Sequence, residues 1–228
     1  MRRRNIALIP AAGVGARFGA GKPKQYVEIN GKTVLQHTIE IFDKHPHIDL
    51  IAVILSPEDS IFQTALSEKV RVFQVGGASR AETVRNGVSV LLEQGLSEAK
   101  DNILVHDAAR CCLPAEALTR LLDEAGENDE GGILAIPVAD TLKRSDGSHH
   151  IDETVARAGL WQAQTPQLFQ TALLHRALSV DDLSEITDEA SAVEKLGIRP
   201  RLVQGDTRNL KLTLPQDEYI VRLLLKAV

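Results

Sequence analysis

A short apolar strand that runs directly into a glycine-rich loop is the feature that constrains this chain most. Residues 6–25 read IALIPAAGVGARFGAGKPKQ and include the cations Arg17, Lys22 and Lys24. Glycines let the backbone approach a ligand closely and point several amide N–H groups toward it. Cations that follow such a loop suit a polyanion, of which a nucleoside triphosphate is the commonest example. The segment therefore predicts a nucleotide-phosphate site at the start of an α/β domain.

Two better-known glycine motifs do not fit this loop. A dinucleotide fingerprint that begins at Gly13 needs a small residue for close helix–strand packing where the chain has Phe18, which also argues against an NAD-binding domain. A Walker A motif that ends at Lys22 needs Gly in place of Ala16 and Ser or Thr in place of Pro23. An ordinary strand-to-helix turn is the simplest alternative, and the three cations favour the phosphate site over it.

Overall composition excludes several classes of partner. The 228 residues are enough for one α/β domain with a full hydrophobic core. A net charge of −5 argues against a general affinity for nucleic acid, which needs a basic face. An aromatic content of 4% leaves few platforms on which single-stranded bases could stack. The cations of the loop therefore indicate a local site on an acidic protein that binds no nucleic acid.

The cysteines and the basic N-terminus bear on where the protein works. Cys111 and Cys112 are adjacent, so they cannot form a spaced disulfide framework, and a reduced compartment is the simplest reading. Residues 2–4 are all Arg and precede an apolar run, as in a signal peptide, but Pro10 interrupts that run. No segment approaches the ~18 apolar residues that a membrane span requires. We expect a soluble cytoplasmic protein that does not bind membranes.

Apolar β-rich runs alternate with helical patterns along the chain. Strands are expected at 6–9, 50–55, 70–75, 103–106, 133–138, 201–203 and 210–214. Helices are expected at 33–42, from the capping box that begins at Ser79 to about Leu92, from Pro114 to about Ala125, and after Pro215. This alternation predicts an α/β fold with a mainly parallel sheet between helices and with ligands at the carboxyl ends of its strands.

The segment at about 139–160 breaks the alternation. Asp146-Gly147-Ser148 is a good turn signal between two polar stretches, 141–144 and 151–157, which could pair as a protruding hairpin. An isolated hairpin is marginal in water, so this arm should pack on something, and a second subunit is a plausible partner. The predicted organisation is a single domain over 1–228 with this arm.

A second chemical signal follows the predicted strand 103–106, where the chain reads His106-Asp107-Ala-Ala-Arg110. An aspartate at the end of a central strand lies where ligands bind in such sheets. Its carboxylate is a natural ligand for Mg²⁺ that bridges phosphates. The alternative, an aspartate that only caps the following turn, is weakened by the neighbouring phosphate loop. Asp107 is therefore the candidate metal ligand.

These motifs together carry a resemblance to a known family. P-A-A-G-x-G-x-R at 10–17, P-K-Q-Y at 23–26 and H-D-A-A-R at 106–110 resemble the 2-C-methyl-D-erythritol 4-phosphate cytidylyltransferase family of the non-mevalonate isoprenoid pathway. Further matches lie in order at 76–77, 80, 137–144, 159–167, 187–191 and 209–213. The resemblance covers residues 6 to about 220 and implies a three-layer, Rossmann-like nucleotidyltransferase domain with a protruding β-arm.

The resemblance implies a CTP site made of loop backbone and cations. The residues that it assigns to the nucleotide are Pro10, Ala11, Ala12, Gly13, Gly15, Gly77, Thr83, Asp107 and Ala108. Arg17 and Lys24 would lie on the phosphates and Lys211 near the α-phosphate, so these three are the expected catalytic residues. Asp107 would bind Mg²⁺ or another divalent cation. Arg110 and Lys22 are second choices that would tune the local field.

The acceptor site is expected to involve two subunits. Thr141 and Arg157 lie on the arm, which in this family reaches into the neighbouring subunit, and with Thr165 they would bind methylerythritol phosphate. The implied protein is a homodimer that transfers the cytidylyl group of CTP to this acceptor by in-line attack on the α-phosphate, with release of pyrophosphate. No strong general base is needed, because a phosphate monoester is already an anion.

Two alternatives to this activity stay open. A ribitol-5-phosphate cytidylyltransferase shares H-D-A-A-R and differs mainly in its arm and acceptor pocket, and Arg157 with the 165–167 segment favours methylerythritol. A regulator that binds CTP without chemistry is the other. It would not need a metal ligand beside Lys24 and Lys211.

The chain departs from the family pattern at two positions. Cys111 stands where the family usually has Pro, which would stiffen the loop that carries the metal ligand. Ala78 stands where relatives often have Asp, so one polar contact to the nucleotide is lost or replaced.

Overall fold

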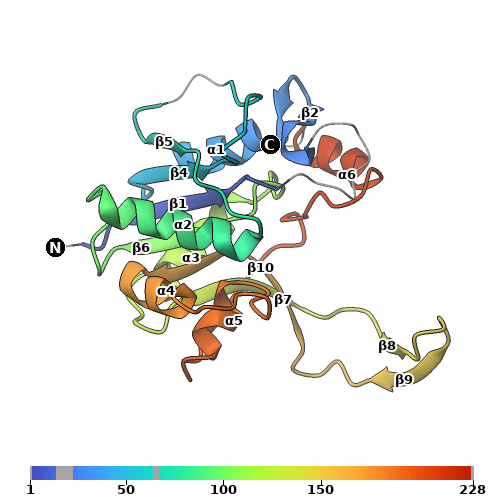
Figure 1. Cartoon of the computed structure of the whole chain (residues 1–228). Helices are drawn as coiled ribbons and strands as arrows, with labels where there is room; N and C mark the ends of the chain where they lie inside the picture. The colour runs from blue at the N-terminus through green and yellow to red at the C-terminus, as the bar shows by residue number, and fades with distance from the viewer. Residues whose placement is uncertain (1, 14–22, 64–66, 227–228) are drawn as a thin grey trace.

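A seven-stranded sheet forms the centre of the protein in the computed structural model, which describes residues 2–13, 23–63 and 67–226 (Figure 1). The strand order is β11-β7-β10-β6-β1-β4-β5. The strands of this sheet are β1 Asn5–Pro10, β4 Leu50–Ile54, β5 Val70–Phe73, β6 Asn102–Val105, β7 Gly132–Pro137, β10 Trp161–Gln170 and β11 Arg201–Gln204. A small pair outside it, β2 Glu28–Ile29 and β3 Lys32–Thr33, precedes the first α-helix.

Helices cover both faces of this sheet. The covering helices are α1 Val34–Asp43, α2 Arg80–Glu93, α3 Ala115–Ala125, α4 Thr171–Leu178 and α5 Glu189–Glu194. A 3-10 turn η1 at Lys24–Tyr26 and a last helix, α6 Asp217–Leu224, complete the set, and α6 packs in a separate small cluster through Val221. Alternate side chains of β1 point to opposite faces: Ala7 and Ile9 pack with α1 and α3, whereas Ile6 and Leu8 pack with α2, α4 and α5. The expected α/β fold with three layers is therefore confirmed.

The capping signals in the sequence mark real helix starts. Ser79 Oγ accepts from Glu82 N at 3.1 Å while the Glu82 carboxylate accepts from Ser79 N, which is the capping box that the sequence predicts. Thr33 and Gln36 form the same arrangement at the start of α1. Pro114 is the N-cap of α3, and α6 begins two residues after Pro215.

One expected strand is absent, and one strand of the central sheet was not expected. No strand forms at 210–214, although Leu210, Leu212 and Leu214 alternate there. This segment has no sheet neighbour and is tied down by single hydrogen bonds such as Leu212 N to Ala109 O at 2.9 Å. The antiparallel strand β10, between β6 and β7, was not predicted. Its polar residues and Pro166 hide the pattern, and a register shift between Ala163 and Gln167 accommodates the proline.

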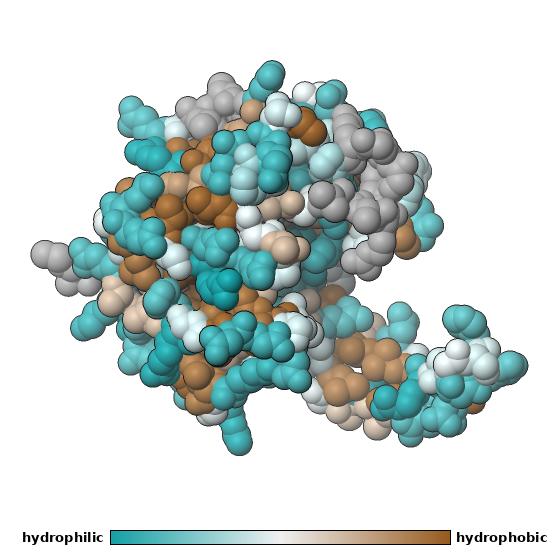
Figure 2. Space-filling model, viewed as in Figure 1, coloured by the Kyte–Doolittle hydropathy of each residue, from teal (hydrophilic) through white to brown (hydrophobic). Residues whose placement is uncertain are grey.

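The predicted arm is present as the antiparallel pair β8 Leu142–Ser145 and β9 Ile151–Val155. The turn signal is correct, because Asp146 Oδ1 accepts from Ser148 N at 2.8 Å and Gly147 has a φ of +89°. The arm extends away from the sheet, and hydrophobic side chains gather at its base (Figures 1 and 2). Ile151 is 67% exposed on it. Among the described residues, no helix has both the length and the apolar character needed to cross a bilayer.

Candidate active site

A cavity of about 380 Å³ opens at the carboxyl ends of the strands β1, β4 and β6. Most of the residues predicted for the nucleotide line it: Pro10, Ala11, Ala12, Gly13, Gly77, Thr83, Asp107 and Ala108, together with the predicted catalytic residues Lys24 and Lys211. Its walls come from six separate stretches of chain, which the sheet topology brings to one edge. Gly15, Arg17 and Lys22 fall within 14–22 and lie outside the described residues.

The predicted acceptor residues do not join this cavity within the chain. Thr141 directly precedes β8 and Arg157 lies two residues after β9, so both flank the open end of the arm hairpin, outside the cavity lining. Thr165 is buried in β10, and its hydroxyl contacts the backbone of Asp107 rather than the open space. One chain therefore gathers the nucleotide residues and leaves the arm residues apart.

Gln25 holds the first half of the phosphate loop. Its buried side chain donates from Nε2 to the carbonyl oxygens of Ala11 and Gly13, at 2.9 Å each. Ala11 N donates in turn to Ile54 O at 2.8 Å, which joins the loop to β4. These bonds fix the backbone that faces the cavity. Gln25 belongs to the P-K-Q-Y motif, but nothing in the sequence alone indicates this role.

The cavity wall formed by residues 76–83 depends on two adjacent glycines, Gly76 and Gly77. A methyl group at Gly76 would overlap Ala12 Cβ and lie 2.7 Å from Leu55 O, so only glycine lets this segment approach the phosphate loop so closely. Thr83 Oγ1 accepts from Gly77 N at 3.1 Å and donates to Ser79 O at 2.9 Å. The Thr83 hydroxyl therefore shapes the backbone at Gly77.

Three cations converge on the carboxylate of Asp107, which is 7% exposed. Lys211 Nζ lies 2.8 Å from Oδ2, Arg80 Nε donates to Oδ1 at 2.9 Å, and Arg110 Nε lies 3.5 Å from Oδ2. Burial alone would raise the pKa of the Asp107 carboxyl, but Arg80, Lys211 and Arg110 hold it well below its usual range. Asp107 is therefore ionised at neutral pH.

The position of Lys211 follows from backbone contacts on either side of it. Arg110 Nη1 donates to Asn209 O at 2.7 Å, and Leu212 N donates to Ala109 O at 2.9 Å. The 209–212 segment is thus fastened to the loop that carries Asp107. This is why a lysine so distant in sequence reaches the aspartate.

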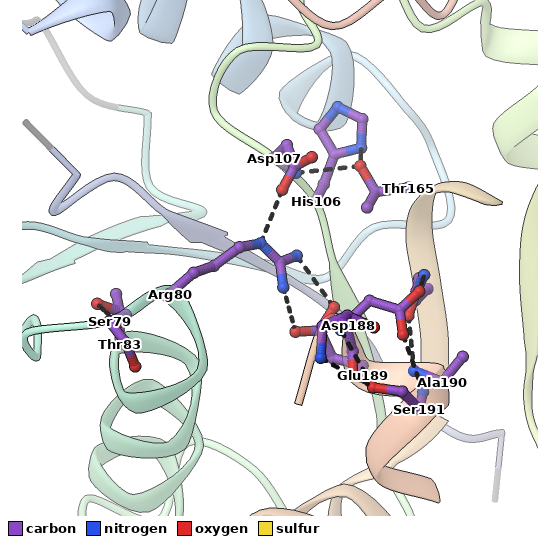
Figure 3. A network of polar contacts seen from close by, with 12 residues as sticks. Ser79, Arg80, Thr83, His106, Asp107, Thr165, Asp188, Glu189, Ala190 and Ser191 are labelled. Atoms are coloured by element: carbon purple, nitrogen blue, oxygen red, sulfur yellow. Dashed lines mark hydrogen bonds and ion pairs between the residues drawn. The ribbon is translucent and has the colours of Figure 1, made fainter. Parts of the chain in front are cut away.

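His106 and Thr165 support Asp107 from the protein interior (Figure 3). Burial lowers the pKa of His106 to about 4, so its ring is neutral. Nε2–H donates to the carbonyl of Arg110 at 2.9 Å, which leaves Nδ1 to accept from the Thr165 hydroxyl at 3.0 Å. The same hydroxyl accepts from Asp107 N at 3.1 Å. The chain of bonds fixes the backbone of the aspartate.

The buried Glu189 forms an ion pair with the half-buried Arg80, and no sequence motif predicts this pair (Figure 3). Arg80 donates from Nη1 and Nη2 to the two carboxylate oxygens of Glu189, at 2.7 and 3.0 Å. Burial opposes the charge of Arg80, yet Glu189 and Asp107 raise the pKa of its guanidinium. Both residues stand in family-like motifs, but nothing local predicts that positions 109 residues apart meet.

The donor set near Asp107 determines which metal could bind. Within the described parts of the chain, no group of three or more His, Cys, Asp or Glu side chains could hold a metal ion. A single ionised carboxylate beside a phosphate cavity fits Mg²⁺, which binds through one or two carboxylates and takes its other ligands from substrate phosphates and water. Asp107 is the residue that fits this role.

The two departures from the family pattern differ in their surroundings. Ala78 lines the cavity, and its backbone N donates to Glu82 Oε2 at 2.7 Å. Cys111 is buried with Ala109 and Leu212 in a small apolar cluster. It therefore packs as a small hydrophobic residue in the segment that follows Asp107.

Comparisons with known proteins agree over the whole chain. The family model for 2-C-methyl-D-erythritol 4-phosphate cytidylyltransferase matches residues 5–227. A relative of that name from Neisseria meningitidis is 69% identical over 231 residues and covers 100% of both chains. One from Chromobacterium violaceum is 49% identical over 224 residues, covering 97% of this chain and 98% of its own.

Solved structures of the same family are also similar to this chain. The crystal structure of a 4-diphosphocytidyl-2C-methyl-D-erythritol synthase superposes with a TM-score of 0.87 and 62% identity and covers 99% of both chains. The 2-C-methyl-D-erythritol 4-phosphate cytidylyltransferase of Francisella tularensis superposes with a TM-score of 0.82 and 32% identity, covering 97% of this chain and 99% of its own. With a nucleotide-sized cavity at the expected sheet edge, these matches show that the chain belongs to the 2-C-methyl-D-erythritol 4-phosphate cytidylyltransferase family.

Proposed function

We propose that the chain transfers the cytidylyl group of CTP to 2-C-methyl-D-erythritol 4-phosphate, with pyrophosphate as the second product. The observation that carries this proposal is the cavity in which Lys24, Lys211 and the ionised Asp107 meet loop backbone. A cavity with this lining suits a triphosphate, because cations and inward-facing amides bind its oxygens.

The main obstacle to this reaction is charge. The acceptor phosphate is an anion that must approach the triphosphate, and negative charge builds on the α-phosphate oxygens as its phosphorus becomes five-coordinate. Fixed positive charge and accurate positioning lower such a barrier, and no strong base is required. We assign these roles to Lys24 and Lys211, together with Arg17. Lys211 is held 2.8 Å from Asp107 in the cavity lining, and we assign it to the α-phosphate.

We assign the divalent cation, Mg²⁺ or a substitute, to Asp107. When bound, the ion would neutralise charge on the phosphates of CTP. The task of the protein is to keep the Asp107 carboxylate ionised and oriented. The neighbouring cations keep it ionised, and the bond from its backbone to Thr165 orients it.

We infer that the acceptor site is completed by a second copy of the chain in a homodimer. Thr141 and Arg157 lie on an exposed arm and cannot be counted among the cavity residues of their own chain. An isolated hairpin with an exposed Ile151 is marginal by itself, so a partner that covers it is favoured. Thr165 would support this half-site by holding Asp107 in place, in addition to any contact with the acceptor. The cytoplasmic location stays a prediction from the sequence.

A turnover assay tests the activity. Pyrophosphate release is measured with CTP and Mg²⁺ in the presence of methylerythritol 4-phosphate, ribitol 5-phosphate or no acceptor. We expect release with the first acceptor and little with the second. Equal use of ribitol 5-phosphate would contradict the acceptor assignment, and binding of CTP without release in any mixture would favour a regulator.

A further inference from the structure

Glu189 has a carboxylate that is buried beside the candidate active site and has no role in the proposed reaction. It is the first residue of α5 and is 1% exposed. Its two oxygens are bound by the guanidinium of Arg80, which also lines the cavity. A buried acidic group next to an anion-binding site needs an explanation, because its charge opposes the binding of phosphates.

The start of α5 is held firmly in place (Figure 3). Asp188 is its N-cap and accepts from Ser191 N at 2.9 Å. Gln167, on β10, donates to Asp188 Oδ2 at 2.9 Å and accepts from Ala190 N at 2.8 Å. Glu189 is therefore a fixed anchor, positioned by both the helix cap and the central sheet.

This anchor determines how Arg80 is used. The forked end of the guanidinium is directed at Glu189, and the remaining nitrogen, Nε, donates to Asp107 Oδ1 at 2.9 Å. An arginine that served mainly to bind phosphate would present that fork to the ligand, since its paired N–H groups match phosphate oxygens. Here the fork is occupied by a protein carboxylate.

Burial raises the pKa of the Glu189 carboxyl, but the two contacts from Arg80, at 2.7 and 3.0 Å, favour its ionised form. The charges of the pair therefore cancel, so Arg80 adds little net positive charge to the cavity. What it adds is a directed hydrogen bond that fixes one oxygen of Asp107 and leaves the other toward Lys211. We propose that Arg80 and Glu189 act as a neutral positioning unit: Glu189 holds Arg80 away from the nucleotide phosphates, and Arg80 orients the Asp107 carboxylate. This inference rests on the proposed function, because it gives Asp107 a role in catalysis.

The proposal predicts an unusual combination for Glu189→Gln. The substitution keeps the shape of the side chain and removes its charge, so Arg80 becomes an uncompensated cation that can turn toward phosphate. Pyrophosphate binding, measured by titration calorimetry in metal-free buffer, should tighten about 3- to 10-fold. The kcat for cytidylyl transfer should fall roughly tenfold or more, because Asp107 loses its fixed orientation.

Two further variants separate charge from geometry. The double variant Arg80→Gln/Glu189→Gln is neutral again, so its pyrophosphate affinity should return to within about 2-fold of wild type while kcat stays low. Arg80→Lys keeps the charge and loses the fork, so it should bind pyrophosphate like wild type and still lose roughly tenfold in kcat. If Glu189→Gln fails to fold, these two variants test the proposal without it.

The outcomes that would overturn the proposal are distinct. If Arg80 is a phosphate ligand, the double variant will bind pyrophosphate at least about tenfold more weakly than wild type. If the pair only stabilises the fold, the folded variants will have wild-type kcat and wild-type affinity. Glu124→Gln is the matched control, because it breaks the remote Arg201–Glu124 pair, and it should change neither quantity. Failure of wild-type turnover would contradict the proposed function, whereas the order of pyrophosphate affinities tests the positioning unit separately.

Discussion

The cavity and the arm differ in how their functional side chains are held. Around the cavity, contacts between distant parts of the chain hold the functional groups, as Arg80 and Lys211 on Asp107 illustrate. On the arm, contacts run between its own two strands, such as Lys143 Nζ to Thr154 Oγ1 at 2.7 Å, and its side chains face solvent. The nucleotide half of the site is therefore preformed in one chain, and the acceptor half depends on where the arm is placed.

The largest expected effect is on the stability of the core beneath the cavity. Phe169 is fully buried in β10, so Phe169→Ala should lower the free energy of unfolding by about 3–5 kcal/mol. Urea denaturation followed by circular dichroism measures this. Phe169→Leu, which keeps most of the apolar volume, should cost clearly less. A small loss in both would mean that the sheet does not support the cavity as described.

Removing a cation from the cavity should affect turnover next most strongly. Lys211→Ala and Lys24→Ala each should lower kcat on the order of 100-fold or more, about 3 kcal/mol of transition-state stabilisation, and should raise KM for CTP much less. Steady-state kinetics with CTP and methylerythritol 4-phosphate give both constants. Normal turnover by both variants would contradict their assignment.

The arm should influence the acceptor and leave the nucleotide unaffected. Arg157→Ala should raise KM for methylerythritol 4-phosphate roughly tenfold, about 1.4 kcal/mol, through the loss of one charged contact. KM for CTP should stay within about 2-fold of wild type. Arg144→Ala is a control on the same arm, because this arginine pairs with Glu153. An equal rise in KM for CTP would remove the distinction between the two regions.

The smallest expected effect concerns the cavity wall formed by residues 76–83. Thr83→Val removes the acceptor of Gly77 N–H and should weaken CTP binding by about 1 kcal/mol. Thr83→Ser keeps the hydroxyl and should bind CTP within about 2-fold of wild type. Calorimetric titration with CTP compares the two. If Ser and Val behave alike, the hydroxyl does not shape the site.

Much of the fold could be predicted because its signals are local. Apolar runs and capping residues such as Ser79 mark strands and helices without reference to the rest of the chain. β10 was missed because Pro166 and several glutamines obscure a strand whose burial comes from the two neighbours it pairs with. The expected strand at 210–214 failed for the opposite reason, since alternating leucines do not form a strand where no neighbour is available to pair.

The residues of the candidate site also fall into those that the sequence predicts and those that it does not. The glycine loop and Asp107 stand in compact motifs directly after strands, so their position at the sheet edge could be inferred from sequence. Most of the supporting contacts could not be inferred, because they join residues far apart in the chain. Glu189 to Arg80 and Thr165 to His106 are examples, and Gln25 was overlooked although it lies close to the loop it fastens.

The division of one active site between two subunits is tested most directly by complementation. Lys211→Ala lacks a cavity cation and Arg157→Ala lacks the arm contact, and each is expected to be weakly active as a homodimer when methylerythritol 4-phosphate is kept well below its KM. After the two are mixed in equal amounts and allowed to exchange subunits, half of the dimers carry both chains, and each of these has one intact site. We predict recovery of roughly a quarter of wild-type activity per chain. Activity no higher than the average of the two separate variants would contradict a shared site.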